Sequence, residues 1–96
     1  MPFFIKTEII KKEYLINTDI RQKIISEHIN WILKLQKNGI NIKSGFLVDG
    51  CKRPGGGGLL ILEMKNFKDA LKLVKNDPMI QNKLVEWKFS EWINIT

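Results

Sequence analysis

A chain of 96 residues holds enough material for one hydrophobic core, so we expect a single domain that spans residues 1–96. Its hydrophobic share of 44% and charged share of 27% are those of a folded globular protein and exclude a disordered tail. The net charge of +6 is carried by scattered lysines, with only Arg21 and Arg53 as arginines, and this composition argues against a dedicated nucleic-acid site.

Cysteine and histidine each occur once in the chain, as Cys51 and His28. An internal disulfide and a zinc motif built from several Cys and His residues are therefore excluded. The lone cysteine suits a reducing cytoplasm, and no apolar run approaches the roughly 20 residues that span a membrane. We expect a cytoplasmic protein with no signal peptide, no metal site and no cofactor.

Residues 3–10 are rich in β-formers and are predicted to form the first strand. Lys6 and Glu8 share one alternating face of this strand, whereas Ile5 and Ile9 lie on the other. Apolar pairs at both ends of the strand favour a central position in a sheet. Residues 11–17 form the connection that follows.

The clearest element is a helix that begins at Asn17 or Thr18 and ends at Gly39. Residues at helical spacing form its core-facing stripe: Ile20, Ile24, His28, Trp31 and Leu35. The histidine side chain is the one best suited to acid–base chemistry near neutral pH, so His28 can act as a general acid or base where a pocket reaches its ring. The alternative, which its position alone favours, is a core histidine bonded to a backbone carbonyl.

Residues 41–48 are predicted to form the second strand, and the apolar residues 59–64 the third. Residues 49–58 between them include Pro54 and four successive glycines and are expected to be a hairpin loop. The glycines precede a strand rather than a helix, which is not the arrangement of a phosphate-binding loop. Closure over a pocket is the functional alternative to simple loop flexibility.

A second helix is capped by Asn66 and ends near Asn76, and residues 79–83 are expected to form one further turn. The last predicted strand covers residues 84–95. Val85, Trp87, Phe89 and Ile93 lie on one of its faces, and Trp92 lies on the other.

Asp77 precedes Pro78 at the predicted C-terminal end of the second helix, where the helix dipole opposes a carboxylate. A histidine partner would compensate, and the pair would fix the imidazole tautomer. The alternative, favoured on local grounds, is an Asp-Pro turn in which the side chain bonds nearby backbone amides.

The element order β-α-β-β-α-β predicts an α+β, ferredoxin-like fold with a four-stranded antiparallel sheet and both helices on one face. Apolar residues lie on both faces of the predicted strands, so one face of the sheet would be left exposed. A homodimer that pairs two such sheets face to face would cover it.

An ordered set of residues resembles the YCII-related (YciI-like) proteins over almost the whole chain. It comprises the helix residue His28, the Gly39 stop, Ser44-Gly45, Phe67-x-x-Ala70, Asp77-Pro78 and a closing strand that ends in Glu91-Trp92. The resemblance implies a ferredoxin-like fold that dimerises into an α/β barrel. It also implies a pocket in which His28 and Asp77 face each other, with Ser44 and Gly45 on the pocket wall.

The resulting hypothesis is a homodimeric enzyme in which His28 is the acid or base, Asp77 orients it and Ser44 contributes a hydrogen bond. The expected chemistry is cofactor-free proton transfer or hydrolysis on a small, partly apolar molecule. One alternative is a non-catalytic module that binds a small ligand or another protein, with His28 in a structural role. The other is a basic module that binds nucleic acid.

Overall fold

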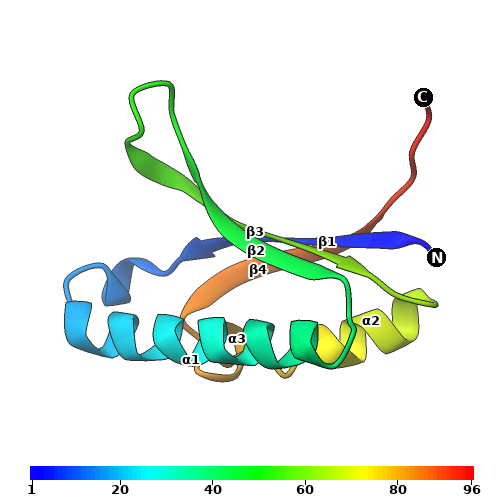
Figure 1. Cartoon of the computed structure of the whole chain (residues 1–96). Helices are drawn as coiled ribbons and strands as arrows, with labels where there is room; N and C mark the ends of the chain where they lie inside the picture. Colours follow the sequence, from blue (N-terminus) through cyan, green and yellow to red (C-terminus); the bar gives the residue numbers. More distant parts are fainter.

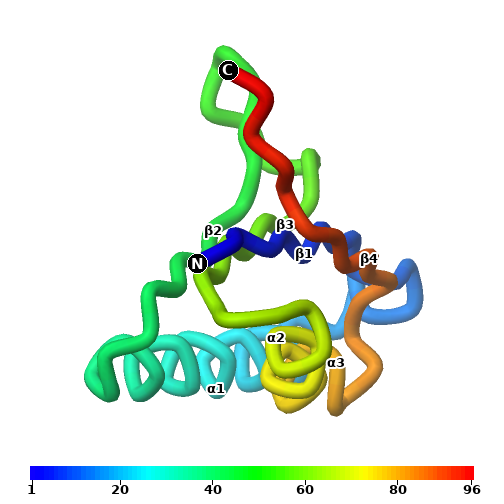
Figure 2. Tube along the Cα trace, turned by 90° about the vertical axis from the view of Figure 1, so that its right-hand side faces the viewer, coloured from blue at the N-terminus to red at the C-terminus, as the bar shows by residue number.

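The computed structural model describes all 96 residues, and it confirms the predicted α+β element order. In chain order the elements are β1 (Phe3–Ile10), the short 3-10 helix η1 (Lys12–Tyr14), α1 (Thr18–Lys37), β2 (Ile42–Val48), β3 (Pro54–Glu63), α2 (Phe67–Val74), α3 (Pro78–Gln81) and β4 (Val85–Trp92). The three α-helices lie on one side of the sheet (Figure 1). The tip of the β2–β3 hairpin and the C-terminal end of the chain rise on the opposite side (Figure 2).

The sheet has the strand order β2-β3-β1-β4, so β1 is an inner strand as predicted, and every neighbouring pair is antiparallel. The register aligns Ser44 of β2 with Leu60 of β3, and Leu60 with Lys6 of β1. Two residues further along β1, Glu8 lies opposite Gly58 of β3. Because directly opposed residues point to the same face of a sheet, Ser44, Lys6 and Glu8 all face the helices.

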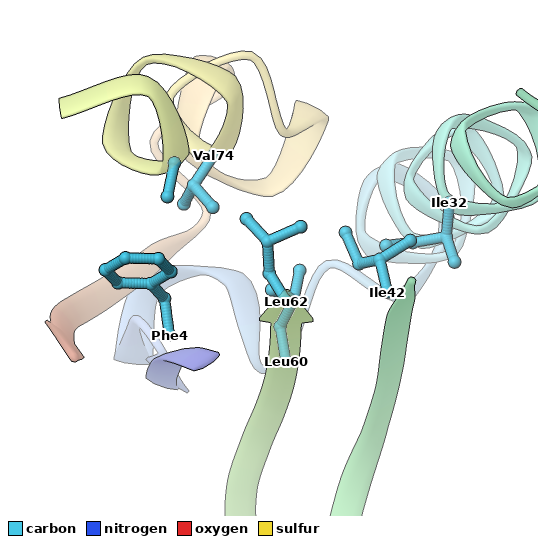
Figure 3. Packing of buried hydrophobic residues seen from close by; sticks show 7 residues of the cluster. Phe4, Ile32, Ile42, Leu60, Leu62 and Val74 are labelled. Carbon is cyan, nitrogen blue, oxygen red and sulfur yellow. The ribbon is translucent and has the colours of Figure 1, made fainter. Parts of the chain in front are cut away.

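The hydrophobic core lies between this sheet face and the helices (Figure 3). Its main cluster joins strand residues to residues of α1 and α2, and its members are Phe4, Ile32, Ile42, Leu60, Leu62, Ala70 and Val74. A second cluster consists of Ile24, Met79, Leu84 and Val85, and it connects α1 to α3 and the start of β4. The two clusters hold α1 and α3 against the sheet, which fixes where their polar side chains point.

The third strand begins earlier than the sequence predicts, because residues 54–58 belong to β3 rather than to the preceding loop. Phe46 pairs with Gly58 and Val48 with Pro54, with a register shift between the two pairs, so β3 extends past the glycines with an irregularity in the ladder. Gly57 has a φ of +84°, and a Cβ atom there would lie 2.3 Å from the carbonyl oxygen of Glu8. A glycine is therefore required where β3 passes the backbone of Glu8 in β1.

The last strand ends at Trp92, three residues before the predicted end at residue 95. The pairing of β1 with β4 stops at Phe3 opposite Trp92, so residues beyond Trp92 have no strand to pair with. Ile93 is expected from the sequence on the same strand face as Val85 and Phe89, but it lies outside the strand and is exposed.

The helices begin and end close to their predicted residues. Asn17 caps α1, and Gly39 follows that helix with a φ of +88° that favours glycine. Asn66 caps α2 by accepting a hydrogen bond from the backbone N–H of Asp69. None of the helices combines the length and apolar character needed to cross a bilayer.

The sheet face that points away from the helices carries apolar side chains. They include Phe3, Ile5, Ile9, Leu59, Ile61 and Trp92. Ile5 and Ile61 lie opposite each other and are half-buried, whereas Ile9 and Trp92 are exposed. No helix of this chain covers that face (Figure 1).

Candidate active site

His28 lies in the middle of α1, on the stripe that faces the sheet, and only 6% of it is exposed. Both ring nitrogens have side-chain partners. Nδ1 lies 2.7 Å from Oδ1 of Asp77, and Nε2 lies 2.7 Å from Oγ of Ser44. The structure therefore brings together His28, Asp77 and Ser44 from three separate elements, and His28 is not the carbonyl-bonded core histidine of the alternative interpretation.

Asp77 caps the N-terminus of α3 rather than ending α2, which corrects the expectation that a helix dipole opposes its carboxylate. Its Oδ1 accepts a hydrogen bond from the backbone N–H of Met79 at 2.9 Å and also contacts His28. The Asp-Pro turn and the partnership with histidine are thus realised together. A carboxylate is favourable at this position, because it satisfies a backbone N–H left free at the start of the helix.

Two buried charged residues of β1 complete the site. Lys6 Nζ lies 2.5 Å from Oδ2 of Asp77 and 2.6 Å from Oε1 of Glu8. The side chains of Lys6 and Asp77 are fully buried, and that of Glu8 is 6% exposed. A continuous chain of contacts, which we call the buried polar network, therefore connects Glu8, Lys6, Asp77, His28 and Ser44.

Lys6 and Glu8 were not identified as site residues from the sequence. The signal that could have found them is the presence of two charged side chains on one face of a strand predicted to be central. An inner strand has little access to water, so charges there need partners inside the protein.

Two opposing effects act on the carboxyl group of Asp77. Burial alone would raise its pKa, but the hydrogen bond with His28 and the positive charge of Lys6 hold the pKa of Asp77 below its usual value of 3.8. Asp77 is therefore ionised at neutral pH, and the proton between it and His28 resides on Nδ1. In the neutral imidazole Nε2 then carries no proton and accepts a hydrogen bond, which the hydroxyl of Ser44 can donate.

A cavity of about 1160 Å³ opens beside the buried polar network, between α1, the β2–β3 hairpin and the end of β1. Glu8, His28 and Ser44 line it, whereas Lys6 and Asp77 lie behind them. Much of the remaining lining is apolar and includes Ile25, Ile29, Ile32 and Leu33 of α1. An apolar cavity with a few convergent polar groups is the usual form of a small-molecule site.

Gly45 also lines the cavity, but a side chain there would meet open space, so nothing in its surroundings requires a glycine. Cys51 is exposed in the turn between β2 and β3, where its backbone N–H bonds the side chain of Asp49, and it does not line the cavity. No three side chains of the His, Cys, Asp and Glu types gather in a geometry that would hold a metal ion.

The fold is shared with solved structures of very different sequence. One is 5-chloro-2-hydroxyhydroquinone dehydrochlorinase (TftG) from Burkholderia phenoliruptrix in complex with 2,5-dihydroxybenzoquinone, which is 19% identical and has a TM-score of 0.69. The match covers 96% of this chain and 94% of that chain. A de novo designed protein, Foldit4, matches over the same shares with 11% identity and a TM-score of 0.52.

Likenesses at such low identity show the ferredoxin-like architecture and nothing about the reaction. No model of a known protein family matches the chain, and no curated protein does.

Proposed function

We propose that this chain is a YCII-related, single-domain cytoplasmic enzyme that performs acid–base chemistry on a small molecule, with His28 as the proton-transferring group. The observation that carries the proposal is the hydrogen-bonded position of His28. Its Nδ1 contacts the ionised Asp77, while its Nε2 contacts Ser44 at the wall of a cavity. A histidine fixed in one tautomer and directed toward a cavity is suited to accept and return a proton near neutral pH.

Besides His28, three members of the buried polar network have a definite part in this chemistry, namely Ser44, Asp77 and Lys6. Ser44 lines the cavity and its Oγ lies 2.7 Å from Nε2, so in this scheme a proton leaving the substrate passes to Oγ of Ser44 as the Ser44 hydroxyl proton passes to Nε2. Asp77 stabilises the imidazolium that forms, because its carboxylate accepts the hydrogen bond from Nδ1. Lys6 keeps that carboxylate ionised and fixed in orientation.

The substrate class is a small molecule with substantial apolar surface, because much of the cavity lining is apolar. The structurally similar dehydrochlorinase was solved with a dihydroxylated benzoquinone. Hydroxylated rings are therefore the first compounds to test, together with small carbon acids such as diketones. No cofactor takes part in this scheme.

A deuterium-exchange screen tests the proposal. The protein is incubated in D₂O with hydroxylated benzenes, hydroxyquinones and diketones, and exchange or conversion is followed by NMR. We expect acceleration for at least one class, and a loss of about 10²-fold or more in His28→Asn, because general acid–base catalysis contributes about 10²–10⁴-fold. The amide of asparagine keeps a donor near Asp77 but cannot transfer the proton.

Glu27→Gln is the matched control, because Glu27 precedes His28 on α1 and is exposed. Equal rates in wild type and His28→Asn would refute the catalytic role. The non-catalytic alternative predicts that compounds raise the melting temperature of both proteins equally and that neither converts them.

The proposal includes a homodimer in which two copies pair their uncovered sheet faces. The support is the row of apolar side chains on that face, centred on Ile5, Leu59 and Ile61, with no helix over it (Figure 2). Exposed apolar patches of this kind mark interaction surfaces in soluble proteins. The cavity lies largely on the helix side of the sheet, so pairing through the outer face leaves it accessible.

A further inference from the structure

The carboxylate of Glu8 has an unsatisfied atom. Its Oε1 pairs with Lys6 at 2.6 Å, whereas its Oε2 is buried and has no hydrogen-bond partner in the protein. Native proteins satisfy almost all buried polar atoms, and those left over are commonly partnered by water, an ion or a ligand. Among the buried side-chain nitrogen and oxygen atoms of this chain, Oε2 of Glu8 is the only one without a partner.

The surroundings of Glu8 connect this atom with the cavity. Glu8 lines the same cavity as His28 and Ser44. Gly58 lies directly opposite it on β3 and lines the cavity as well. A Cβ atom at Gly58 would lie 2.8 Å from Cγ and 3.1 Å from Cδ of Glu8, so the Glu8 side chain packs directly against the glycine and any larger residue there would displace it.

We propose that Oε2 of Glu8 accepts a hydrogen bond from the molecule that occupies the cavity, and that this molecule is a small, largely apolar compound bearing a hydroxyl group. The inference deepens the proposed function and rests on it, because it assumes that the cavity is the substrate site. A hydroxyl is favoured over a cationic donor for two reasons. Lys6 already balances the charge of Glu8, and the apolar lining would make a second buried cation costly.

The sheet geometry limits the size of this compound. Glu8 of β1 and Ser44 of β2 point to the same side of the sheet, and β3 lies between their strands. Ser44 is aligned with Lys6, and Glu8 lies two residues further along β1. Strand spacing and residue rise put their Cα atoms about 12 Å from each other. After both side chains extend over the sheet, a single six-membered ring fits between them. Such a ring would present a hydroxyl to Glu8 and its opposite edge to Ser44 and His28.

The test compares para-cresol with its methyl ether in NMR titrations of the full ¹⁵N-labelled chain. The ether is more apolar but cannot donate a hydrogen bond, so burial alone would favour it. We expect wild type to bind para-cresol about tenfold more tightly, with amide shifts at Glu8 and Gly58. Equal affinities, or no binding of either compound at millimolar concentration, would overturn the proposal.

Glu8→Gln tests the residue itself. The amide oxygen of the glutamine stays paired with the ammonium of Lys6, so its NH₂ group takes the place of Oε2. A hydrogen-bond donor then stands where wild type has an acceptor. We expect the preference for para-cresol over the ether to fall to near equality. Glu86→Gln is the control, because Glu86 is exposed on β4, and it should keep the preference. An unchanged preference in Glu8→Gln would mean that a water satisfies Oε2 and would overturn the ligand role.

Gly58→Ala provides a second variant that retains every charge. Its methyl group would overlap Cγ of Glu8, so the carboxylate must move and the preference should again be lost. The proposed function and the role of Glu8 in ligand binding can be refuted independently of each other. His28→Asn should keep the para-cresol preference while losing proton transfer. Loss of turnover in His28→Asn with no effect of Glu8→Gln on the preference would leave the proposed function standing and remove only this inference.

Discussion

Lys6→Met tests the energetic role of the buried polar network. The ammonium of Lys6 is fully buried and compensates two carboxylates, those of Glu8 and Asp77. Methionine has a similar length and shape but no charge, so the substitution leaves both carboxylates inside the protein with less compensation. Breaking a buried ion pair by removing one partner typically costs about 3–5 kcal/mol.

This cost is large for a chain of this size. Domains of about 100 residues have free energies of unfolding of about 5–15 kcal/mol, so a loss of about 3–5 kcal/mol in Lys6→Met removes about a fifth of the stability or more. At about 4–8 °C per kcal/mol, the melting temperature should fall by about 12–40 °C. Lys88→Met is the matched control, because Lys88 is exposed on β4. That substitution should change the free energy of unfolding by no more than about 0.5 kcal/mol.

The assay is urea unfolding followed by circular dichroism, at one fixed protein concentration because the protein is proposed to dimerise. Measurements at several pH values identify the cause. Lys6 is one of the groups that lower the pKa of Asp77, so its removal raises the pKa of Asp77. The stability deficit of Lys6→Met relative to wild type should therefore shrink as the pH falls from 7 toward 3, because a protonated Asp77 no longer needs the ammonium.

A double variant separates charge from packing. Glu8→Gln in the Lys6→Met background removes one of the two carboxylates, so the double variant should be more stable than Lys6→Met alone. A loss below about 1 kcal/mol in Lys6→Met, with a pH dependence equal to that of wild type, would refute the view that Lys6 compensates buried charge.

Three further predictions concern other parts of the molecule. Because the pKa of Asp77 is depressed in the folded state, its contribution to wild-type stability is present above pH 3.8 and is lost as the pH falls through the folded value. The free energy of unfolding of Asp77→Asn, measured in urea, should therefore depend less on pH in that acid range than that of wild type. Gly57→Ala should destabilise more than Gly39→Ala in thermal melts: both have positive φ, but only at Gly57 would the new Cβ collide with backbone. Ile61→Lys should convert the proposed dimer to a monomer in analytical ultracentrifugation without unfolding the chain, and an unchanged mass would refute sheet-face pairing.

The sequence by itself determined the order of the elements and the character of α1. Periodicity is a local property, so spacings of three and four residues identified the stripe that contains His28. Caps and breakers such as Asn66 and Gly39 identified the helix ends for the same reason.

The boundaries of β3 and β4 could not be read locally. Residues 54–58 are glycine-rich and resemble a loop, but Gly58 and Pro54 pair with β2 on either side of a register shift, and the strand extends to Pro54. Residues 93–95 contain strand-forming isoleucines, yet they lie beyond the end of β1 and have no neighbour to pair with. Strand ends depend on the partner strand rather than on propensity.

Only the tertiary structure decided which face of β1 is buried and how its charges are compensated. Alternation shows that Lys6 and Glu8 share a face, but it does not show that this face points toward the helices. That orientation is stable because Asp77, 71 residues further along the chain, meets Lys6 in the interior. A buried charge is tolerated only beside its partner, and the fold alone brings these two residues together.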